Sequence, residues 1–262
     1  MKNKPKNLIK SLDRALNILE LITNNKQAIS ISEISTETGL HKSTVHRILS
    51  TLKYRGYTAQ KENNNKYTTG IKLIELGSLV INQLNLRKTV LPYMENLMEL
   101  TGETIHLGIL NDDLEVIYIE KVEGSQTIRM HSQIGKRAPS YSTSLGKVLL
   151  AFRYGADIDH IFKESDLIAK TSNTITSLSK LKDQMNLIKK RGYSIDNCEN
   201  EEEIRCIAGP IFNHKNKITA AFSVSGPANR LTMEKINSSY KKFILEYSQN
   251  ISKELGSNNF LD

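Results

Sequence analysis

The sequence predicts an α+β fold made of two domains joined by a helix. Apolar residues recur at helical spacing as far as Tyr54, and from Thr104 short β-prone runs alternate with helices. A chain of 262 residues is long enough for two ordinary domains. Strands, helices and strands in that order are typical of an α+β domain with an antiparallel sheet. We therefore expect domains at 1–70 and 101–262, with linker helices at 71–100.

The basic charge is concentrated at the N-terminus. The net charge is +8, and residues 1–70 hold 12 Lys and Arg against 5 Asp and Glu, whereas residues 71–262 hold 24 against 23. This asymmetry indicates that the N-terminal segment contacts nucleic acid or another anionic surface. A merely solvated basic domain is the alternative that charge alone leaves open.

Composition and segment lengths disfavour membrane and secreted proteins. No apolar run approaches the roughly 18–20 residues that a membrane-spanning helix needs. The basic N-terminus lacks the apolar stretch and cleavage site of a secretory signal. The two cysteines, Cys198 and Cys206, cannot form a disulfide framework. We expect a cytoplasmic protein with no membrane partner.

Two helices, the second of them short, are expected at the start of the N-terminal domain. Ser11 or Asp13 can cap the first helix. Its expected apolar stripe is Leu12, Ala15, Leu16, Leu19 and Ile22. Ser30 or Ser32 can cap the second helix, and Gly39 then supplies the permissive backbone of a tight turn.

The third helix, within GLHKSTVHRILSTLKYRGY (39–57), has a polar face without acids. A solvated helix face usually mixes charge signs, because opposite charges four residues apart stabilise a helix. Hydroxyl, Lys, His and Arg side chains near a helix start suit a reader of the DNA major groove. The predicted DNA-contacting residues here are Lys42, Ser43, Thr44, His46, Arg47 and Lys53, opposite an apolar stripe of Val45, Ile48, Leu49 and Leu52.

A hairpin is expected directly after this helix. Tyr57–Gln60 and Lys66–Thr69 are β-prone and flank a polar turn. Helix, turn, helix and hairpin together form a winged helix-turn-helix. Lys61 and Lys66, near the hairpin tip, are predicted to contact the DNA backbone or minor groove.

The linker is expected to be helical, with an interruption near Asn85 and Pro92 in the early turns that follow. Its apolar stripe contains Leu73, Leu76, Leu79 or Val80, and Leu84. A helix between two domains has little of its own domain to lie against, so we expect it to pair with a second copy in a homodimer. Ordinary packing on the C-terminal domain is the alternative.

The C-terminal domain is expected to contain six strands and four helices. The strands are Thr104–Leu110, Glu115–Lys121, Thr127–His131, Tyr193–Asp196, Ile204–Phe212 and Lys217–Ser225. The first helix lies within SYSTSLGKVLLAFR (140–153), after a hydroxyl-rich entry. The others lie near Asp157–Phe162, at Ser177–Arg191 and from about Met233 to Leu255.

A small-carboxylate site is the candidate chemistry of this domain. Ser140–Ser144 leads into a helix N-terminus, where free N–H groups and the helix dipole favour an anion. Asp196, Cys206, Ser223 and Ser225 lie on or beside strands of the second β region. Such a site would bind a carboxylate without a strong cation of its own. Hydroxyl residues before a helix are more commonly simple caps, which is the alternative.

Catalytic and metal sites find little support in the sequence. It has no GxSxG, HExxH, phosphate-loop or dinucleotide motif. Cys206 has no evident His partner along the chain, and the six His lack metal-ligand spacing. Glu199 and Glu201–Glu203 are interpreted as a solvated acidic loop. We expect no enzyme, no metal and no cofactor.

Five segments resemble the IclR family of transcription regulators, in the family's order from about Ser11 to Lys253. They are SLDRALNILELI, ISEISTETGLHKSTVHRILSTLKYRGY, YTTGIKLIELG, STSLGKVLLAF and RGYSIDNCENEEEIRCIAGPIF. The resemblance implies a winged helix-turn-helix domain, a linker helix and a GAF/PAS-like sensing domain for a small organic acid. It implies dimers that commonly become tetramers on a double-stranded DNA operator. The implied effector-binding positions are Met130, Ser144, Leu145, Gly146, Asp196, Cys206, Ser223 and Ser225.

Two positions depart from the family pattern. The family often has Pro at the position of His41, so this chain loses a rigid helix start and gains a titratable side chain near DNA. The family usually has Gly at the position of Glu203, so the loop before Cys206 is expected to be shaped differently.

Three functions remain as hypotheses from the sequence. The first is a regulator, a repressor rather than an activator, whose operator affinity changes when an organic acid binds. The second is a DNA-binding regulator whose C-terminal domain only oligomerises. The third is an enzyme with Cys206 as its nucleophile.

Overall fold

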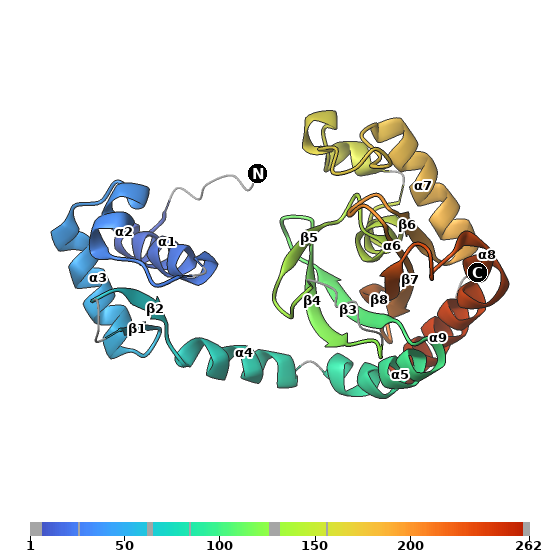
Figure 1. Cartoon of the computed structure of the whole chain (residues 1–262), viewed down its shortest axis with the longest axis horizontal. Coiled ribbons are helices and arrows are strands. Elements are labelled where there is room, and N and C mark those ends of the chain that lie inside the picture. Colours follow the sequence, from blue (N-terminus) through green and yellow to red (C-terminus); the bar gives the residue numbers. More distant parts are fainter. Residues whose placement is uncertain are drawn as a thin grey trace. The chain divides into compact units, whose positions relative to one another are not determined.

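The computed structural model describes residues 7–25, 27–61, 65–83, 85–125, 132–155 and 157–258. The chain divides into two compact units, residues 1–84 and 85–262 (Figure 1). Among the described residues, no helix is both long and apolar enough to cross a membrane.

Three helices form the core of the N-terminal unit: α1 (Lys10–Asn24), α2 (Ile31–Thr38) and α3 (Lys42–Tyr54). The expected stripe on α1 is partly wrong, because Ile18 and Ile22 are the residues it buries, whereas Leu12 and Leu16 are about half exposed. The expected caps of α1 are also wrong, since the helix begins one residue earlier and its N-cap, Ile9, makes no side-chain bond.

Local sequence signals set the turn between α2 and α3. Ser30 accepts a hydrogen bond from the Glu33 amide, and the Glu33 carboxylate accepts one from the Ser30 amide at 2.7 Å. Gly39 ends α2 in the left-handed conformation at φ +68°. The chain then enters α3 through His41, whose side chain makes no capping bond.

The expected hairpin follows α3 as strands β1 (Thr58–Gln60) and β2 (Tyr67–Thr69). They pair antiparallel, and Tyr67 also bridges to Ile29 in the segment before α2. This bridge ties the hairpin to the helices, and the buried Tyr67 ring completes the core of the unit. Helix α4 (Lys72–Gln83) comes next.

A six-stranded antiparallel sheet forms the centre of the C-terminal unit. The spatial order is β5-β4-β3-β8-β7-β6. The bounds are β3 (Thr104–Leu110), β4 (Glu115–Val122), β5 (Arg137–Pro139), β6 (Ser194–Asn197), β7 (Ile204–Phe212) and β8 (Ile218–Pro227). These observations confirm the predicted α+β class with an antiparallel sheet.

Helices cover both faces of this sheet. Ala208 and Ala221 belong to the apolar cluster of α6 (Ser144–Arg153) and α7 (Leu178–Arg191). On the other face, a Cβ at Gly209 would lie 2.5 Å from Ser248 Oγ of α9 (Lys241–Glu254), so this glycine permits close packing. Helix α5 (Asn85–Thr101) packs beside α9, where the Tyr93 and Tyr247 rings meet edge to face.

The expected strand Thr127–His131 lies outside the described residues. The other expected elements differ from the structure at three places. Strand β5 was not predicted, since three residues ending in Pro show no alternation. The segment near Asp157 forms short 3-10 turns, η1 (Asp157–His160) and η2 (Glu164–Asp166). The last helix is interrupted, with α8 (Met233–Lys235) and a π-turn, η3 (Ile236–Tyr240), before α9.

Candidate functional site

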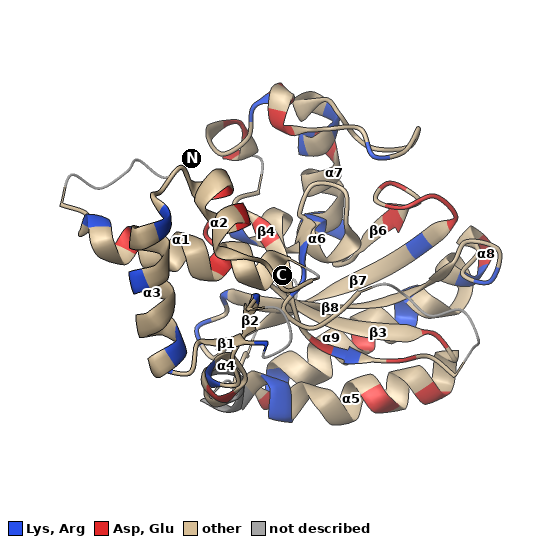
Figure 2. Cartoon of the chain, turned by 60° about the vertical axis from the view of Figure 1, so that its left-hand side comes forward, with Lys and Arg blue, Asp and Glu red and all other residues tan. Residues whose placement is uncertain are grey.

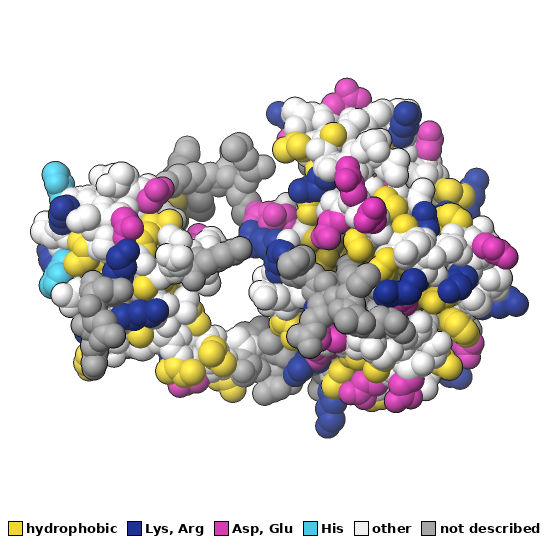
Figure 3. Space-filling model, in the orientation of Figure 1, with side chains coloured by type: hydrophobic (Ala, Val, Ile, Leu, Met, Phe, Trp, Pro, Cys, Tyr) yellow, Lys and Arg dark blue, Asp and Glu magenta, His cyan; other side chains and the backbone are white. Residues whose placement is uncertain are grey.

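The polar face of α3 is exposed and free of acidic residues. Lys42, Ser43, His46, Arg47 and Lys53 are exposed and Thr44 is half-buried, whereas Val45 and Leu49 are fully buried. Figure 2 shows basic residues along the α3 ribbon, and Figure 3 shows histidines on the outer surface of the same unit. The helix therefore presents hydroxyl and cationic groups together on one surface.

The lysines near the hairpin differ in their surroundings. Lys53 Nζ donates to Gln60 Oε1 at 2.9 Å, which directs its ammonium group toward the hairpin. Lys66 Nζ lies 3.6 Å from Glu33, so its charge is partly compensated. Lys61 is exposed and directly precedes residues 62–64, which lie outside the described residues. Of these predicted contacts, Lys66 is the weakest candidate for a phosphate.

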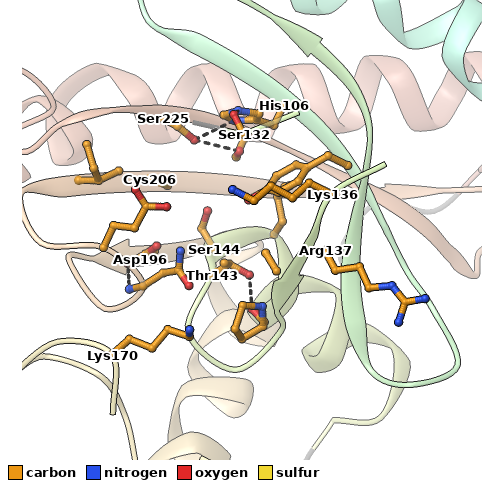
Figure 4. Close-up of a pocket in the computed structure, with 18 residues that line it drawn as sticks. His106, Ser132, Lys136, Arg137, Thr143, Ser144, Lys170, Asp196, Cys206 and Ser225 are labelled. Atoms are coloured by element: carbon orange, nitrogen blue, oxygen red, sulfur yellow. Dashed lines mark hydrogen bonds between the residues drawn. The ribbon is translucent and has the colours of Figure 1, made fainter. Parts of the chain in front are cut away.

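A cavity of about 240 Å³ lies between the sheet and the N-terminus of α6 (Figure 4). Its lining comes from all six strands of the sheet, from the start of α6 and from the adjoining loops. The polar lining residues are His106, Tyr118, Ser132, Lys136, Arg137, Thr143, Ser144, Lys170, Asp196, Asn200, Glu201, Cys206, Ser223 and Ser225. The apolar ones are Ala138, Pro139, Leu145 and Ile204. Most of the lining residues therefore carry a polar group.

Sheet register brings distant parts of the sequence together here. Asp196 pairs with Cys206, and Cys206 pairs with Ser225, across β6, β7 and β8. Ser223 pairs with His106 across β8 and β3. All five side chains line the cavity, on the same face of the sheet as α6. The floor is thus a polar row that crosses four strands.

The N-terminus of α6 forms the opposite wall. Thr143 is the N-cap, and its hydroxyl accepts from the Gly146 amide at 3.2 Å. Among the described residues, no hydrogen bond to the Ser144 hydroxyl is found, although Ser144 is only 2% exposed. In Figure 4 this hydroxyl points toward the cavity. This hydroxyl is therefore open to the cavity and can bond a ligand group.

The structure places most, but not all, of the predicted effector residues around the cavity. Ser144, Leu145, Asp196, Cys206, Ser223 and Ser225 line it. Gly146 does not: a Cβ there would lie 2.2 Å from Ser140 Cα, so this glycine lets α6 approach the Ser140 turn. Met130 lies outside the described residues.

The expectation of a site without a strong cation is wrong. Lys136 and Lys170 line the cavity, and Figure 4 shows both ammonium groups directed toward its interior. Arg137 also lines it, but its guanidinium points away and donates to Glu115 at 2.9 Å. Lys136 precedes the unpredicted strand β5 and Lys170 lies in an irregular loop, so no sequence pattern marked either residue.

His106 and Tyr118 are further lining residues that sequence reasoning missed. The His106 imidazole lies 3.2 Å from Ser225 Oγ through Nδ1 and 2.6 Å from Ser132 Oγ through Nε2. Its ring centroid lies 5.2 Å from that of Tyr118. Nothing near His106 in the sequence points to these partners, because each bond spans a large separation along the chain.

The interpretation of Glu199 as part of a solvated loop is wrong. It is 6% exposed and forms a buried ion pair with Lys147 of α6, whose side chain is fully buried. Glu201, Glu202 and Glu203 are exposed, as expected. Because Glu199 is far from Lys147 in sequence, the glutamates of this loop look equivalent along the chain.

Burial shifts the pKa values of several cavity groups. Desolvation raises the pKa of Asp196 to about 7, although the nearby Lys147 and the Glu199 amide favour the carboxylate. Burial and the neighbouring Lys121 lower the pKa of His106 to about 3, so its imidazole is neutral. Burial raises the pKa of Cys206 well above its usual value, which keeps the thiol protonated.

The loop before Cys206 has an unusual backbone angle at Glu203. Glu203 adopts φ +62°, the left-handed conformation that glycine accommodates most readily. Its carbonyl accepts from the Ala228 amide at 2.7 Å, so the position is held from outside the loop.

Within the described parts of the chain, no group of three His, Cys, Asp or Glu residues is placed to hold a metal ion.

Family models match both units of the chain. Residues 11–62 match the IclR helix-turn-helix domain. Residues 78–253 match the C-terminal domain of bacterial IclR transcriptional regulators. Together these matches span both the α3 face and the cavity.

Curated relatives agree with the family models. The HTH-type transcriptional regulator XynR of Escherichia coli is 37% identical over 86% of this chain and 88% of its own length. The transcriptional repressor IclR of the same organism is 32% identical over 87% of this chain and 84% of its own.

Solved structures show the same fold. The Thermotoga maritima IclR crystal structure is 37% identical, with a TM-score of 0.75 over 95% of this chain and all of that chain. A homologue from Microbacterium hydrocarbonoxydans, in complex with 4-hydroxybenzoate, has a TM-score of 0.79 at 24% identity over 94% of this chain and 98% of its own.

Proposed function

Because the chain belongs to the IclR family of transcriptional regulators, we propose that it represses transcription from an operator bound by α3 and that a small organic acid in the cavity changes this affinity. The chain is a regulator and not an enzyme, since the domains and relatives that match it are transcriptional regulators. The protonated Cys206 thiol is also a poor nucleophile.

The exposed face of α3 supports DNA reading. Lys42 and Ser43 lie in its first turn, where N–H groups of the helix also favour phosphate. His46 and Arg47 follow one turn later and are exposed. This order positions the helix by phosphate contacts at its start and leaves Arg47 free to fork onto a guanine edge.

The unpartnered Ser144 hydroxyl carries the sensing half of the proposal. It lies in the first turn of α6, where backbone N–H groups and the helix dipole favour a carboxylate. Lys136 and Lys170 add positive charge around the cavity. A small organic anion would accept a hydrogen bond from this hydroxyl and lie within this positive charge. The homologue in complex with 4-hydroxybenzoate holds an organic acid, which supports the same ligand class here.

Repression is the proposed sign of regulation. The relative named transcriptional repressor IclR aligns over most of both chains, so its sign of control is the reasonable expectation for this one. Ligand binding against α6 would alter the C-terminal unit and, through the linker helices, the spacing of two α3 helices. Operator affinity depends on that spacing, because half-sites lie about one helical turn apart.

Exposed apolar residues on two helices of the N-terminal unit support a dimer. Helix α1 exposes Leu12 and Leu16, and Leu8 and Ile9 before or at its start are exposed as well. Along α4, Ile74 and Leu79 are 65% and 58% exposed. Such surfaces favour association, and a second copy of the chain would bring a second α3 helix to the DNA. We propose a homodimer that can assemble into a tetramer on its operator.

The test measures operator binding and ligand response with the full chain. Fluorescence anisotropy with duplexes covering the DNA upstream of its own and adjacent genes should reveal one fragment bound at least about 1,000-fold more tightly than random DNA. A panel of small carboxylic acids should then change that affinity in the wild type and change it less in Ser144→Ala. Specific DNA binding that no acid alters, and no thermal stabilisation by any acid, would favour a C-terminal domain that only oligomerises.

A further inference from the structure

The polar floor of the cavity contains a continuous chain of hydrogen-bonding groups. Ser132 Oγ lies 2.6 Å from His106 Nε2, His106 Nδ1 lies 3.2 Å from Ser225 Oγ, and Ser225 Oγ lies 3.2 Å from Ser223 Oγ. Figure 4 shows the first three of these groups together at one end of the cavity. Each of the four residues lines the cavity.

The neutral imidazole fixes which group donates and which accepts at each step of this row of hydrogen bonds. A neutral His has one N–H donor and one acceptor nitrogen, so it accepts from one neighbouring serine and donates to the other. When Nδ1 carries the proton, Ser225 can donate to Ser223, and Ser223 can donate into the cavity. When Nε2 carries it, the order reverses and Ser223 can accept from the cavity. The Ser223 hydroxyl, at the end of this row of hydrogen bonds, can therefore offer the cavity either a donor or an acceptor.

A ligand hydroxyl is the group that suits such an end. Hydroxyls both donate and accept, whereas a carboxylate only accepts and a hydrocarbon does neither. The other cavity groups point the same way, since Tyr118, Asn200 and Asp196 supply a phenol, a carboxamide and a carboxyl group around the same space. Only four lining residues are apolar, and in the described structure no aromatic slot for a flat ring is formed by them.

The size and charge of the cavity limit the ligand further. Its volume of about 240 Å³ lies below the ~300–1,000 Å³ of pockets that take drug-sized molecules. Lys170 and the N-terminus of α6 favour one carboxylate at the α6 wall, across the cavity from the sheet row that contains His106. The ligand is then a short molecule, anionic at one end and hydroxylated along its length.

We propose that the effector is a polyhydroxylated carboxylic acid of the aldonic-acid type, and that His106 is the residue that selects its hydroxyl groups. This inference rests on the proposed sensing function and adds the ligand class to it. His106 acts through Ser225 and Ser223 as well as by lining the cavity, so its loss should affect ligand choice more than carboxylate binding.

The test compares acids of equal carbon number with and without hydroxyls. Isothermal titration of the full chain would use D-glycerate, D-xylonate and D-gluconate against propanoate, pentanoate and hexanoate, with 4-hydroxybenzoate as the aromatic acid. A site built to bond hydroxyls rejects the analogue that lacks them. At least one hydroxylated acid should bind tenfold or more tightly than its deoxygenated partner and than 4-hydroxybenzoate.

Two variants assign this preference to His106. His106→Phe keeps a ring of similar shape and should reduce the tenfold preference to threefold or less. Ser223→Ala removes the last hydroxyl of the hydrogen-bonded row. It gives the same readout if His106→Phe does not fold. A preference that survives in the folded variants would overturn the role of His106.

The remaining outcomes distinguish a wrong ligand class from a wrong sensing function. If an alkanoate or 4-hydroxybenzoate binds as tightly as every hydroxylated acid, the ligand class is wrong and the sensing function stands. If no acid binds while specific DNA binding persists, the sensing function itself fails, and the ligand class fails with it.

Discussion

Lys147 Nζ donates hydrogen bonds to both carboxylate oxygens of Glu199, at 2.5 and 2.6 Å, inside the C-terminal unit. The pair joins α6 to the turn between β6 and β7, and residues of both elements line the cavity. The Glu199 amide also donates to Asp196 Oδ1 at 2.7 Å. The ion pair therefore positions a residue that lines the cavity.

Lys147→Met should destabilise the protein strongly. Removing one partner leaves the Glu199 carboxylate buried and uncompensated, which costs about 3–5 kcal/mol. Urea denaturation of the full chain would measure the loss. The double variant Lys147→Met with Glu199→Leu removes both charges and should recover most of it. A single variant as stable as the wild type would contradict the role given to the pair.

The stability contributed by Asp196 should fall as pH rises. Its folded-state pKa of about 7 lies above the ordinary 3.8, so the folded chain binds the proton more tightly than the unfolded chain does. The unfolding free energy therefore decreases between about pH 4 and pH 7, by at most about 1.4 kcal/mol per pH unit from this group.

Asp196→Asn removes this titration. The stability of the variant relative to the wild type should increase from pH 4 to pH 7 and stay level above that range. Ser223→Ala, which removes no titrating group from the same cavity, should differ from the wild type by one constant amount. Urea midpoints at matched pH values measure both, and parallel pH curves for Asp196→Asn would refute the expected shift.

Most of the fold could be predicted because its signals are local. The capping box of Ser30 and Glu33 and the left-handed Gly39 each depend on a few neighbouring residues. The stripe on α1 failed for a different reason. Leu12 and Leu16 have helical spacing, but spacing alone does not distinguish a face that packs inside the unit from one left for a partner.

The site was less predictable because it depends on register and distance. Asp196, Cys206 and Ser225 become neighbours only through the pairing of β6, β7 and β8. His106 joins them because β3 pairs with β8 rather than only with the adjacent β4. Residue type and helix position identified the Ser144 wall, whereas the partners of His106 required the folded sheet.

Glu203→Gly should stabilise the protein slightly. Glu203 is in the left-handed region, which costs a non-glycine residue roughly 1–2 kcal/mol, and glycine removes that cost. Glycine also gives the unfolded chain more conformational freedom, which offsets part of the gain in stability. We expect a net gain of up to about 1 kcal/mol, measured by urea denaturation. The matched control is Glu202→Gly, whose backbone is not left-handed and which should lose stability. A loss at both positions would contradict the strain assigned to Glu203.

Arg47→Ala should weaken specific operator binding by about 1–3 kcal/mol if Arg47 contacts a base edge. Lys42→Ala should weaken binding to specific and random DNA alike, and lower the salt dependence by about one unit of slope. Anisotropy titrations at several salt concentrations separate the two effects. Lys215→Ala, an exposed cation on the turn between β7 and β8, should change neither quantity. Unaltered specific binding in both α3 variants would remove α3 from the reading role.

Charges placed on the exposed stripe of α1 should dissociate the dimer. Leu12 and Leu16 are 55% and 50% exposed, one helical turn apart, so their replacement by Glu leaves the core of the unit untouched. Buried against a second copy, two carboxylates would be desolvated without partners. Sedimentation equilibrium should give about twice the 29.6 kDa chain mass for the wild type and the single mass for Leu12→Glu with Leu16→Glu.

The control is Leu187→Glu, an equally simple change at a 44% exposed leucine of α7, which should leave the dimer intact. Dissociation should also lower affinity for the full operator more than affinity for a single half-site. In a dimer, binding of one α3 helix holds the second near the other half-site at a high effective concentration, and a monomer lacks this advantage. A dimer that persists in the double variant, with folding verified by circular dichroism, would assign the contact to α4 or to the C-terminal unit. Leu79→Glu, at the 58% exposed position of α4, then distinguishes these two surfaces by the same mass measurement.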